Sequence, residues 1–149
     1  MDIMDRKSAA TNRKARFNYH LVENYEAGIS LLGSEVKSIR DGKADLKEGY
    51  VKIENNEMFL YNVNISAYEH ISDREYDPLR KRKLLLHRNE IKKISEKVTQ
   101  GGLALVPVEL YFKDGIVKLE IALGRGKKTY DKREAIKERE VKREMDRAG

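Results

Sequence analysis

Residues 104–123 read ALVPVELYFKDGIVKLEIAL, and this stretch decides the fold. Apolar residues alternate with others along both halves, as they do in a β-strand that has one face on a core. Asp114-Gly115 separates the halves, and this dipeptide is typical of the two-residue turn of a β-hairpin. We therefore expect two long antiparallel strands, whose apolar faces are formed by Ala104, Val106, Val108, Leu110 and Phe112, and by Val117, Leu119, Ile121 and Leu123.

Further strands are expected on the N-terminal side of this hairpin. Alternation from Phe17 to Val22, and again from Ala27 to Leu31, predicts two strands joined by a short connection. A second hairpin is expected from residues 50–54 and 57–65. Asparagine can adopt the positive φ angles of a tight turn, so Asn55-Asn56 is a suitable connection.

Two short helices are expected between these strands. Ser34 can cap the first helix and Gly42 can end it. Residues 89–100 predict the second, because Ile91, Ile94 and Val98 form an apolar stripe. About six mostly antiparallel strands with inserted short helices predict a mainly β fold. We expect an OB-type antiparallel β-barrel, because closure removes the exposed edges of a sheet.

The composition divides the chain into three parts. Residues 1–12 are polar and are expected to form a flexible N-terminal arm, residues 13–123 the barrel, and residues 124–149 a basic C-terminal tail. The tail holds ten Lys/Arg and six Asp/Glu, in a chain of net charge +6. Its apolar residues form no continuous stripe, and each helical ion pair contributes only about 0.2–0.5 kcal/mol. We therefore expect a tail that is disordered in isolation and helical when bound.

The sequence offers no positive case for catalysis or for a cofactor. The chain has no cysteine, which excludes disulfides and thiolate metal sites. Its three histidines lack metal-ligand spacing, and no Ser/His/Asp motif is present, so we expect neither an enzyme nor a metal or cofactor site. No apolar run approaches the ~20 residues of a membrane span, and we expect a soluble, cytoplasmic protein.

Clusters of basic residues indicate a polyanionic partner. Gly124–Arg133 reads GRGKKTYDKR, in which cations surround Tyr130. This pattern suits RNA, because cations neutralise phosphates and an aromatic ring can stack on a base. Asn12–Arg16 and Arg80–Lys83 are two further clusters, and the first helix carries Lys37 and Arg40 on one side. For Gly124–Arg133 and for the helix with Lys37 and Arg40, an ordinary solvated surface is an equal alternative, and the residues alone leave both interpretations open.

Four motifs together resemble one known family. They are GSEVKSIR at residues 33–40, RKLLLH at 82–87, LVP with YF at 105–107 and 111–112, and RGKKTYDKR at 125–133. In this order and spacing they resemble the SmpB family, the SsrA-binding partners of tmRNA in bacterial trans-translation. The resemblance runs from about Asn12 into the tail, which is nearly the whole chain.

The resemblance implies a non-enzymatic RNA-binding adaptor. Its barrel would bind the tRNA-like domain of tmRNA and deliver tmRNA to stalled ribosomes. Its tail would enter the empty mRNA channel beyond the decoding centre and become helical there. Elongation factor Tu is expected on the same tmRNA, and the protein is expected to be a monomer.

The resemblance also assigns residues to these two surfaces. The residues expected at the tmRNA-binding surface are Asn12, Arg13, Lys14, Glu26, Lys37, Arg40, Lys83, Leu85, Lys127 and Lys128. Those expected at the decoding centre and in the mRNA channel are Gly126, Tyr130, Asp131, Lys132, Arg133, Lys137 and Arg139. Among them, Tyr130 is expected to stack on a ribosomal base.

Two other functions remain open on the sequence. A generic OB-fold protein of single-stranded nucleic acid would present several aromatic residues on one exposed barrel face, whereas most aromatics here alternate into the core pattern. A small RNA-cleaving enzyme is the third hypothesis, and RNA that stays intact on incubation with the protein would count against it.

Overall fold

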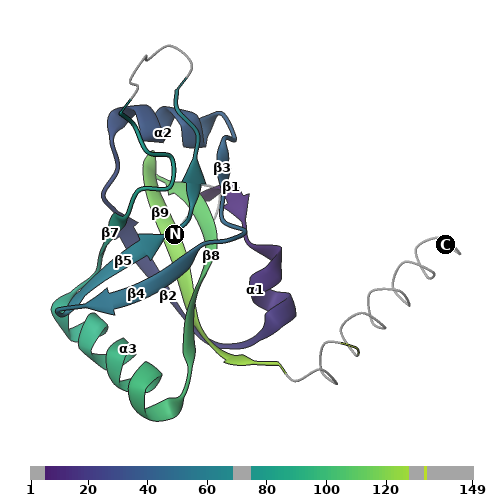
Figure 1. The fold of residues 1–149 in the computed structure, drawn as a ribbon, viewed down its shortest axis with the longest axis vertical. Coiled ribbons are helices and arrows are strands. Elements are labelled where there is room, and N and C mark those ends of the chain that lie inside the picture. Colours follow the sequence, from purple (N-terminus) through teal and green to yellow (C-terminus); the bar gives the residue numbers. More distant parts are fainter. Residues whose placement is uncertain (1–5, 69–74, 128–132, 134–149) are drawn as a thin grey trace, which may run out of the picture.

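The computed structural model describes residues 6–68, 75–127 and 133, and its centre is the expected hairpin (Figure 1). Strands β8 (Ala104–Lys113) and β9 (Ile116–Gly126) pair antiparallel along their length. Asp114 and Gly115 between them have φ angles of 52° and 78°, so the predicted two-residue turn is confirmed. Strand β9 continues to Gly126, three residues beyond the predicted end of the barrel.

Most of the strands form one antiparallel sheet. Its order is β1-β8-β9-β2-β7-β5-β4, and β3 pairs with β6 in a separate two-stranded sheet. The remaining elements are β1 (Arg6–Thr11), α1 (Arg13–Asn18), β2 (Tyr19–Ile29), α2 (Gly33–Arg40), β3 (Ala44–Asp45), β4 (Tyr50–Glu54), β5 (Glu57–Tyr61), β6 (Asn64–Ile65), β7 (Arg82–Leu85) and α3 (Arg88–Gly101). The sheet curls so that β4 contacts β8, but its edge strands do not pair. The fold is mainly β and OB-like, with a barrel that is not closed.

The N-terminal segment differs from the prediction. Residues 6–11 do not form a flexible arm, because they pair with β8 as the edge strand β1. Arg6 anchors this strand: its guanidinium lies 3.7 Å from the centre of the Tyr111 ring and contacts the carboxylates of Glu109 and Glu120. A polar six-residue strand carries little local signal, and its partner lies about a hundred residues further along the chain.

The two strands predicted over residues 17–31 are also revised. Residues 13–18 form the short helix α1, and residues 19–29 form the single strand β2. The polar segment that suggested a connection lies within β2, on the part of the strand that pairs with β9. Its outward side chains are satisfied across the sheet, since Asn24 donates a hydrogen bond to Glu120 at 2.6 Å.

The side chains of β8 that face the main core do not follow the simple alternation predicted from the sequence. Val108 is an extra residue opposite β9, because Pro107 pairs with Ile121 and Glu109 with Glu120. This bulge switches the face that each side chain takes. Leu105, Leu110 and Phe112 therefore contribute to the main core, whereas Val106 and Val108 pack on Ala15 and Ala122 in a second, smaller cluster.

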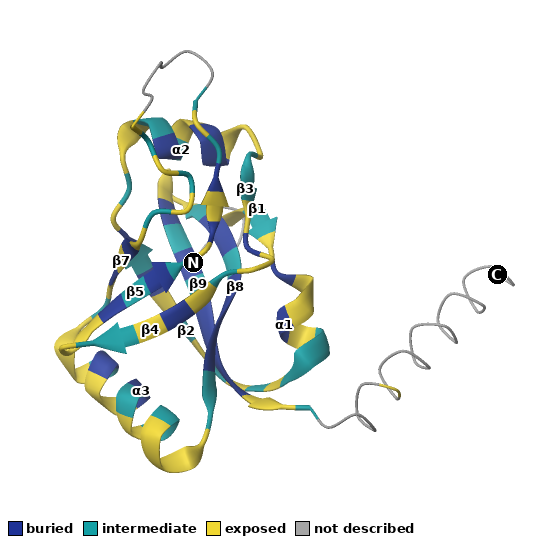
Figure 2. Ribbon diagram, in the orientation of Figure 1, coloured by how far each residue is buried: buried dark blue, intermediate teal, exposed yellow. Residues whose placement is uncertain are grey.

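Two of the helices were expected, and their glycine ends are confirmed. Helix α3 buries Ile91 and Ile94 on the sheet and ends at Gly102, whose φ is 64° (Figure 2). Helix α2 is followed by Gly42 with φ 75°. Ser34 is not the N-cap of α2, however, since Leu32 occupies that position.

Candidate nucleic-acid interface

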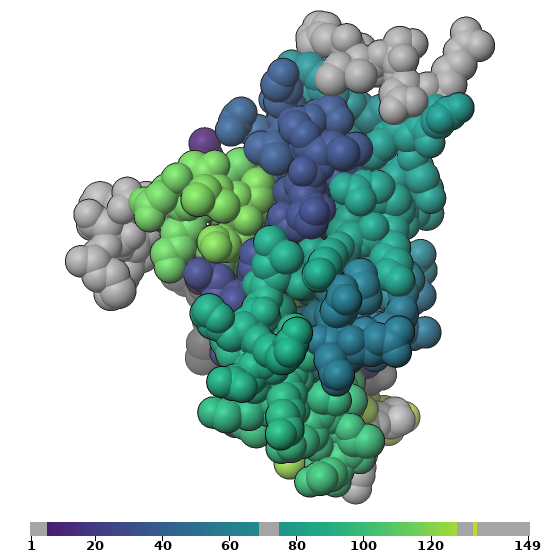
Figure 3. All heavy atoms as spheres, turned by 90° about the vertical axis from the view of Figure 1, so that its left-hand side faces the viewer, coloured from purple at the N-terminus to yellow at the C-terminus, as the bar shows by residue number. Residues whose placement is uncertain are grey.

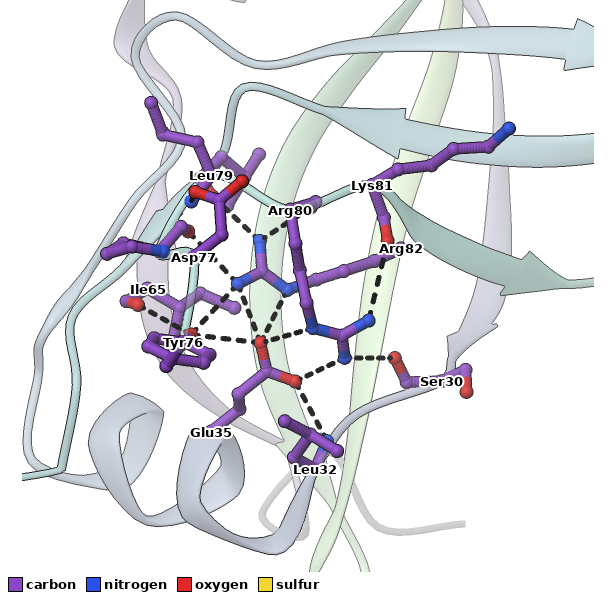
Figure 4. Close-up of polar contacts among 12 residues, drawn as sticks. Ser30, Leu32, Glu35, Ile65, Tyr76, Asp77, Leu79, Arg80, Lys81 and Arg82 are labelled. Carbon is purple, nitrogen blue, oxygen red and sulfur yellow. Dashed lines mark hydrogen bonds and ion pairs between the residues drawn. The ribbon is translucent and has the colours of Figure 1, made fainter. Parts of the chain in front are cut away.

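A buried cluster of charges fixes α2 against β7 (Figure 4). Glu35, in the first turn of α2, is 1% exposed, and its carboxylate accepts hydrogen bonds from Arg82 Nε at 2.8 Å and Nη2 at 2.6 Å. Arg80 Nε and Nη2 donate to the same carboxylate at 3.1 and 2.5 Å. The backbone N–H of the N-cap residue Leu32 donates to it at 2.8 Å, so Glu35 also satisfies one backbone donor at the start of α2.

The Arg82 guanidinium is completely buried and has a partner on every side. It donates to the carbonyl of Val63 at 2.8 Å, to that of Pro78 at 3.0 Å and to the Tyr76 hydroxyl at 3.1 Å. A buried charge is tolerated only when it is paired and hydrogen-bonded. Arg82 therefore holds α2, β7 and the loop after β6 together and is not available to a partner.

The charged form of Glu35 is strongly favoured in this cluster. Burial alone would raise the pKa of the carboxyl group, but hydrogen bonds from Arg80, from the Leu32 backbone and from Arg82 outweigh it and lower the pKa to about 2. The cluster is therefore ionic throughout the neutral pH range.

The basic run Arg80–Lys83 is less available than its sequence suggested. Arg80 and Arg82 both bind Glu35. Lys81 pairs with Glu54 at 3.2 Å, and Lys83 pairs with Glu57 at 3.0 Å. Lys83 faces outward on β7, and Lys81, which precedes the strand, is also exposed, so a polyanion would compete with carboxylates for both lysines.

Helix α2 presents two of the predicted RNA-binding cations to solvent. The Lys37 ammonium lies 5.5 Å from the centre of the Tyr68 ring, and the Arg40 guanidinium lies 5.4 Å from that of Phe112. Both residues are exposed. Since the Glu35 cluster fixes the helix below them, these cations are held in place by the fold.

A second group of predicted residues meets on the outer face of the sheet. Gly28 of β2 pairs with Leu85 of β7, and a Cβ atom at Gly28 would lie 3.2 Å from that of Leu85. The missing side chain leaves Leu85 52% exposed over the strand. Glu26 stands two residues before Gly28 on the same outward face, whereas Lys83 lies beside Ser30, so Leu85 lies between Glu26 and Lys83 along the sheet.

The Glu26 carboxylate is held by a buried tyrosine. The Tyr111 side chain is 1% exposed, and its hydroxyl donates to Glu26. This bond lowers the pKa of Glu26, and Lys113 at 3.4 Å adds to the effect. Burial, followed by the bond to Glu26, raises the pKa of Tyr111.

The remaining predicted residues of the barrel lie around α1 and the end of β9. Asn12 is buried, and its Nδ2 donates to the Pro107 carbonyl at 2.9 Å. Arg13 and Lys14 are exposed at the start of α1, and Lys14 contacts Glu48 at 3.5 Å. The backbone N–H of Lys127 donates to Asn18 at 2.8 Å, which places the start of the tail beside α1. The structure thus separates these residues from the group on α2 and the sheet.

Most of the predicted tail residues lie outside the described residues. Lys128, Tyr130, Asp131, Lys132, Lys137 and Arg139 belong to this set. Gly126 ends β9, and Arg133 is exposed.

Sequence reasoning missed Glu35, Arg82 and Tyr111 as the residues that position this surface. A weak signal was available for Arg82, which stands two residues before the core residue Leu84 and so shares its inward face. Nothing local marked the carboxylate 47 positions earlier as its partner.

Within the described residues, no group of three or more His, Cys, Asp or Glu side chains could hold a metal ion. Over the same ranges, no helix is long and apolar enough to cross a membrane.

Comparison with known proteins gives a consistent result. A sequence model of the family described as SmpB protein matches residues 9–149. The SsrA-binding protein of Trichodesmium erythraeum is 57% identical over 143 residues, covering 95% of this chain and 92% of its own. That of Persephonella marina is 54% identical over 139 residues, covering 93% and 91%. A solved chain described under "tmRNA-SmpB: a journey to the center of the bacterial ribosome" is 46% identical, with a TM-score of 0.68, covering 85% of this chain and 92% of that one.

Proposed function

The chain belongs to the SmpB family, and from this premise we propose that it is an RNA-binding adaptor of trans-translation. It binds tmRNA through its tRNA-like domain and acts with it on stalled ribosomes. The observation that carries this proposal is the similarity, across 85% of the chain, to a solved SmpB chain described together with tmRNA and the bacterial ribosome.

The tmRNA-binding surface that we propose centres on α2 and the outer face of β2 and β7. Lys37 and Arg40 are exposed cations on a helix that the Glu35 cluster holds in place. Glu26 of β2 and Leu85 of β7 lie on the outer face of the sheet, as an acceptor for RNA hydroxyl or amino groups and as an apolar contact. A surface that mixes cations with such groups suits a folded RNA better than a uniformly basic one would.

The tail completes the proposal. Gly126, Tyr130, Asp131, Lys132, Arg133, Lys137 and Arg139 would lie in the decoding centre and mRNA channel, with Lys127 and Lys128 on phosphates at the exit from the barrel. The excess of cations in residues 124–149 supports binding to ribosomal RNA. The protein would act in the cytoplasm as a monomer, without catalysis of its own, beside elongation factor Tu on the same tmRNA.

One feature favours a generic protein of single-stranded nucleic acid as the second candidate. Tyr50 and Tyr61 stack on the β4–β5 hairpin with ring centres 5.3 Å apart, and Lys52 lies 5.7 Å from the Tyr50 ring. Aromatic rings with cations on an OB-like sheet are a platform for unpaired bases. The two rings already stack on each other, however, and this uses part of their surface.

A gel-shift titration separates the two candidates. The protein is titrated against tmRNA and against an unrelated structured RNA of equal length, at two salt concentrations. The adaptor requires a preference for tmRNA that persists at the higher salt. Equal binding that collapses as salt rises would indicate phosphate electrostatics alone and would favour the generic protein.

A further inference from the structure

A pocket of about 300 Å³ opens between β1, α2 and the β8–β9 turn. Its lining includes Ala9 of β1, Ile39 and Arg40 of α2, and Phe112 of β8, with Lys7 at the edge. Gly42 and Gly115 also line it, and a Cβ atom at either glycine would meet nothing within 4 Å. Figure 3 shows α2 beside the β8–β9 hairpin on the outside of the molecule.

The chemistry of the lining is apolar on the floor and cationic at the rim. Phe112, Ile39 and Ala9 supply the apolar surface, whereas Lys7 and Arg40 supply the charge. No carboxylate is among the described residues that line it. At the small end of the 300–1,000 Å³ range of ligand pockets, the space suits a single planar group.

The strand that forms one wall is held firmly. Ala9 is the extra residue of a β-bulge, because Ser8 pairs with Tyr111 and Ala10 with Leu110. Bulges re-aim side chains and recur beside functional sites. Two residues before Ser8, Arg6 binds Glu109 and Glu120, so the backbone that carries Lys7 is anchored to the sheet.

The Arg40 guanidinium lies 5.4 Å from the centre of the Phe112 ring. Aromatic faces and guanidinium planes are the two protein surfaces on which an unstacked base lies most readily. Lysine and arginine at the rim are the usual contacts of the phosphates on either side of such a base. An anion without an aromatic group would use the rim but leave the floor empty.

We propose that this pocket binds one unpaired nucleobase of an RNA, stacked against Phe112, with the flanking phosphates on Lys7 and Arg40. The inference rests on the proposed function in taking RNA as the ligand, and it gives β1 a part in binding. The proposed pocket would bind an exposed base, whereas Lys37 and Glu26 are proposed to contact the surface of a folded RNA.

The test uses the full chain and an RNA that consists of the tRNA-like domain of tmRNA. Ala9→Leu fills the pocket without a change of charge, and Phe112→Leu removes the stacking face while it keeps an apolar side chain. We expect each to weaken binding about 5- to 100-fold, with the slope of affinity against salt unchanged. Lys7→Gln should reduce that slope by about one. Lys92→Gln, an exposed cation on α3, is the matched control and should bind as wild type.

Wild-type affinity in both Ala9→Leu and Phe112→Leu, with the thermal unfolding temperature retained, would overturn the proposal. If either variant fails to fold, amide chemical shifts of the wild-type protein decide. Addition of a short unstructured RNA should shift the amide resonances around residues 7–9, 40–42 and 112–115. If these resonances do not shift, the proposal is overturned as well. Equal shifts with a nucleoside monophosphate alone would identify a free nucleotide as the ligand and would contradict RNA binding.

These outcomes are separate from those of the proposed function. If the wild-type protein does not prefer tmRNA over an unrelated RNA, the proposed adaptor function is contradicted, whatever the affinities of the variants. If the preference for tmRNA persists unchanged in Ala9→Leu and Phe112→Leu, the proposal for the pocket is contradicted, whereas the proposed adaptor function is not.

Discussion

Arg82 of β7, which binds Glu35 in the first turn of α2, and Arg40, the last residue of α2, have opposite roles. Arg82 is completely buried and donates to a carboxylate, three carbonyls and a hydroxyl. Arg40 is exposed, and its guanidinium lies over the Phe112 ring. The difference shows that basic residues in this chain divide into those that build the surface and those that can bind through it. Position in the fold decides which, and a count of charges does not.

The largest expected effect comes from breaking the buried cluster. Glu35→Gln leaves Arg82 without its counter-charge in the interior, which should lower the free energy of unfolding by about 3–5 kcal/mol. Denaturant unfolding followed by circular dichroism measures this loss. The double variant Glu35→Leu with Arg82→Met should recover part of it, since both charges are then gone. A loss below about 1 kcal/mol in Glu35→Gln would show that the cluster does not hold the fold.

Acid should weaken the same cluster without any mutation. The pKa of Glu35 is about 2 in the folded chain and 4.5 for an ordinary glutamate. The carboxylate therefore contributes its full stabilisation above about pH 4.5 and loses it as the pH falls from there through 2. The contribution is up to about 3 kcal/mol. In wild type, stability measured from pH 6 to pH 2.5 should fall more steeply than in the Glu35→Leu/Arg82→Met variant, and equal slopes would contradict this.

The exposed side of α2 should behave in the opposite way. Arg40→Ala or Lys37→Ala should weaken binding to the tRNA-like domain by about 1–3 kcal/mol, the range of a hydrogen bond to a charged group. Neither should change the unfolding free energy by more than about 0.5 kcal/mol, as is usual for surface positions. Unchanged affinity in both variants would remove α2 from the RNA surface.

The smallest effect is expected for a cation that a carboxylate already neutralises. Lys83 pairs with Glu57 at 3.0 Å, and both side chains are about half exposed. Lys83→Gln should change stability by less than about 1 kcal/mol. If Lys83 binds RNA after leaving Glu57, the salt slope falls by about one. An unchanged slope would assign Lys83 to the ion pair alone.

Features with local signals were predictable from the sequence. Asp114-Gly115 marks the central hairpin, and Asn55 and Asn56 adopt the expected positive φ angles of 51° and 64° in the second one. Gly102 ends α3 as its position indicated. In each case the neighbouring residues alone restrict the backbone, so the order and spacing of residues along the chain were enough to predict the turn or the helix end.

Features that depend on distant partners could not be predicted. The pairing of β1 with β8 joins segments about a hundred residues apart, and the bulge at Val108 reverses an alternation that looked regular. The burial of Arg82 follows from a carboxylate on another element. The pocket beside Phe112 arises only where three elements meet. The resemblance to a family was enough to list the expected site residues. The contacts that hold these residues in place could be identified only from the structure.

The most direct test of the adaptor function is a tagging reaction on ribosomes stalled at the end of an mRNA without a stop codon. Full-length protein is compared with a chain cut after Lys127, which keeps all of β9 and removes residues 128–149. We predict that the full chain supports addition of the tmRNA-encoded peptide, and that the shortened chain binds tmRNA within a few-fold of wild type but adds no tag. Tagging at a normal level by the shortened chain would contradict the role of the tail, and absence of tagging with the full chain would contradict the adaptor function itself.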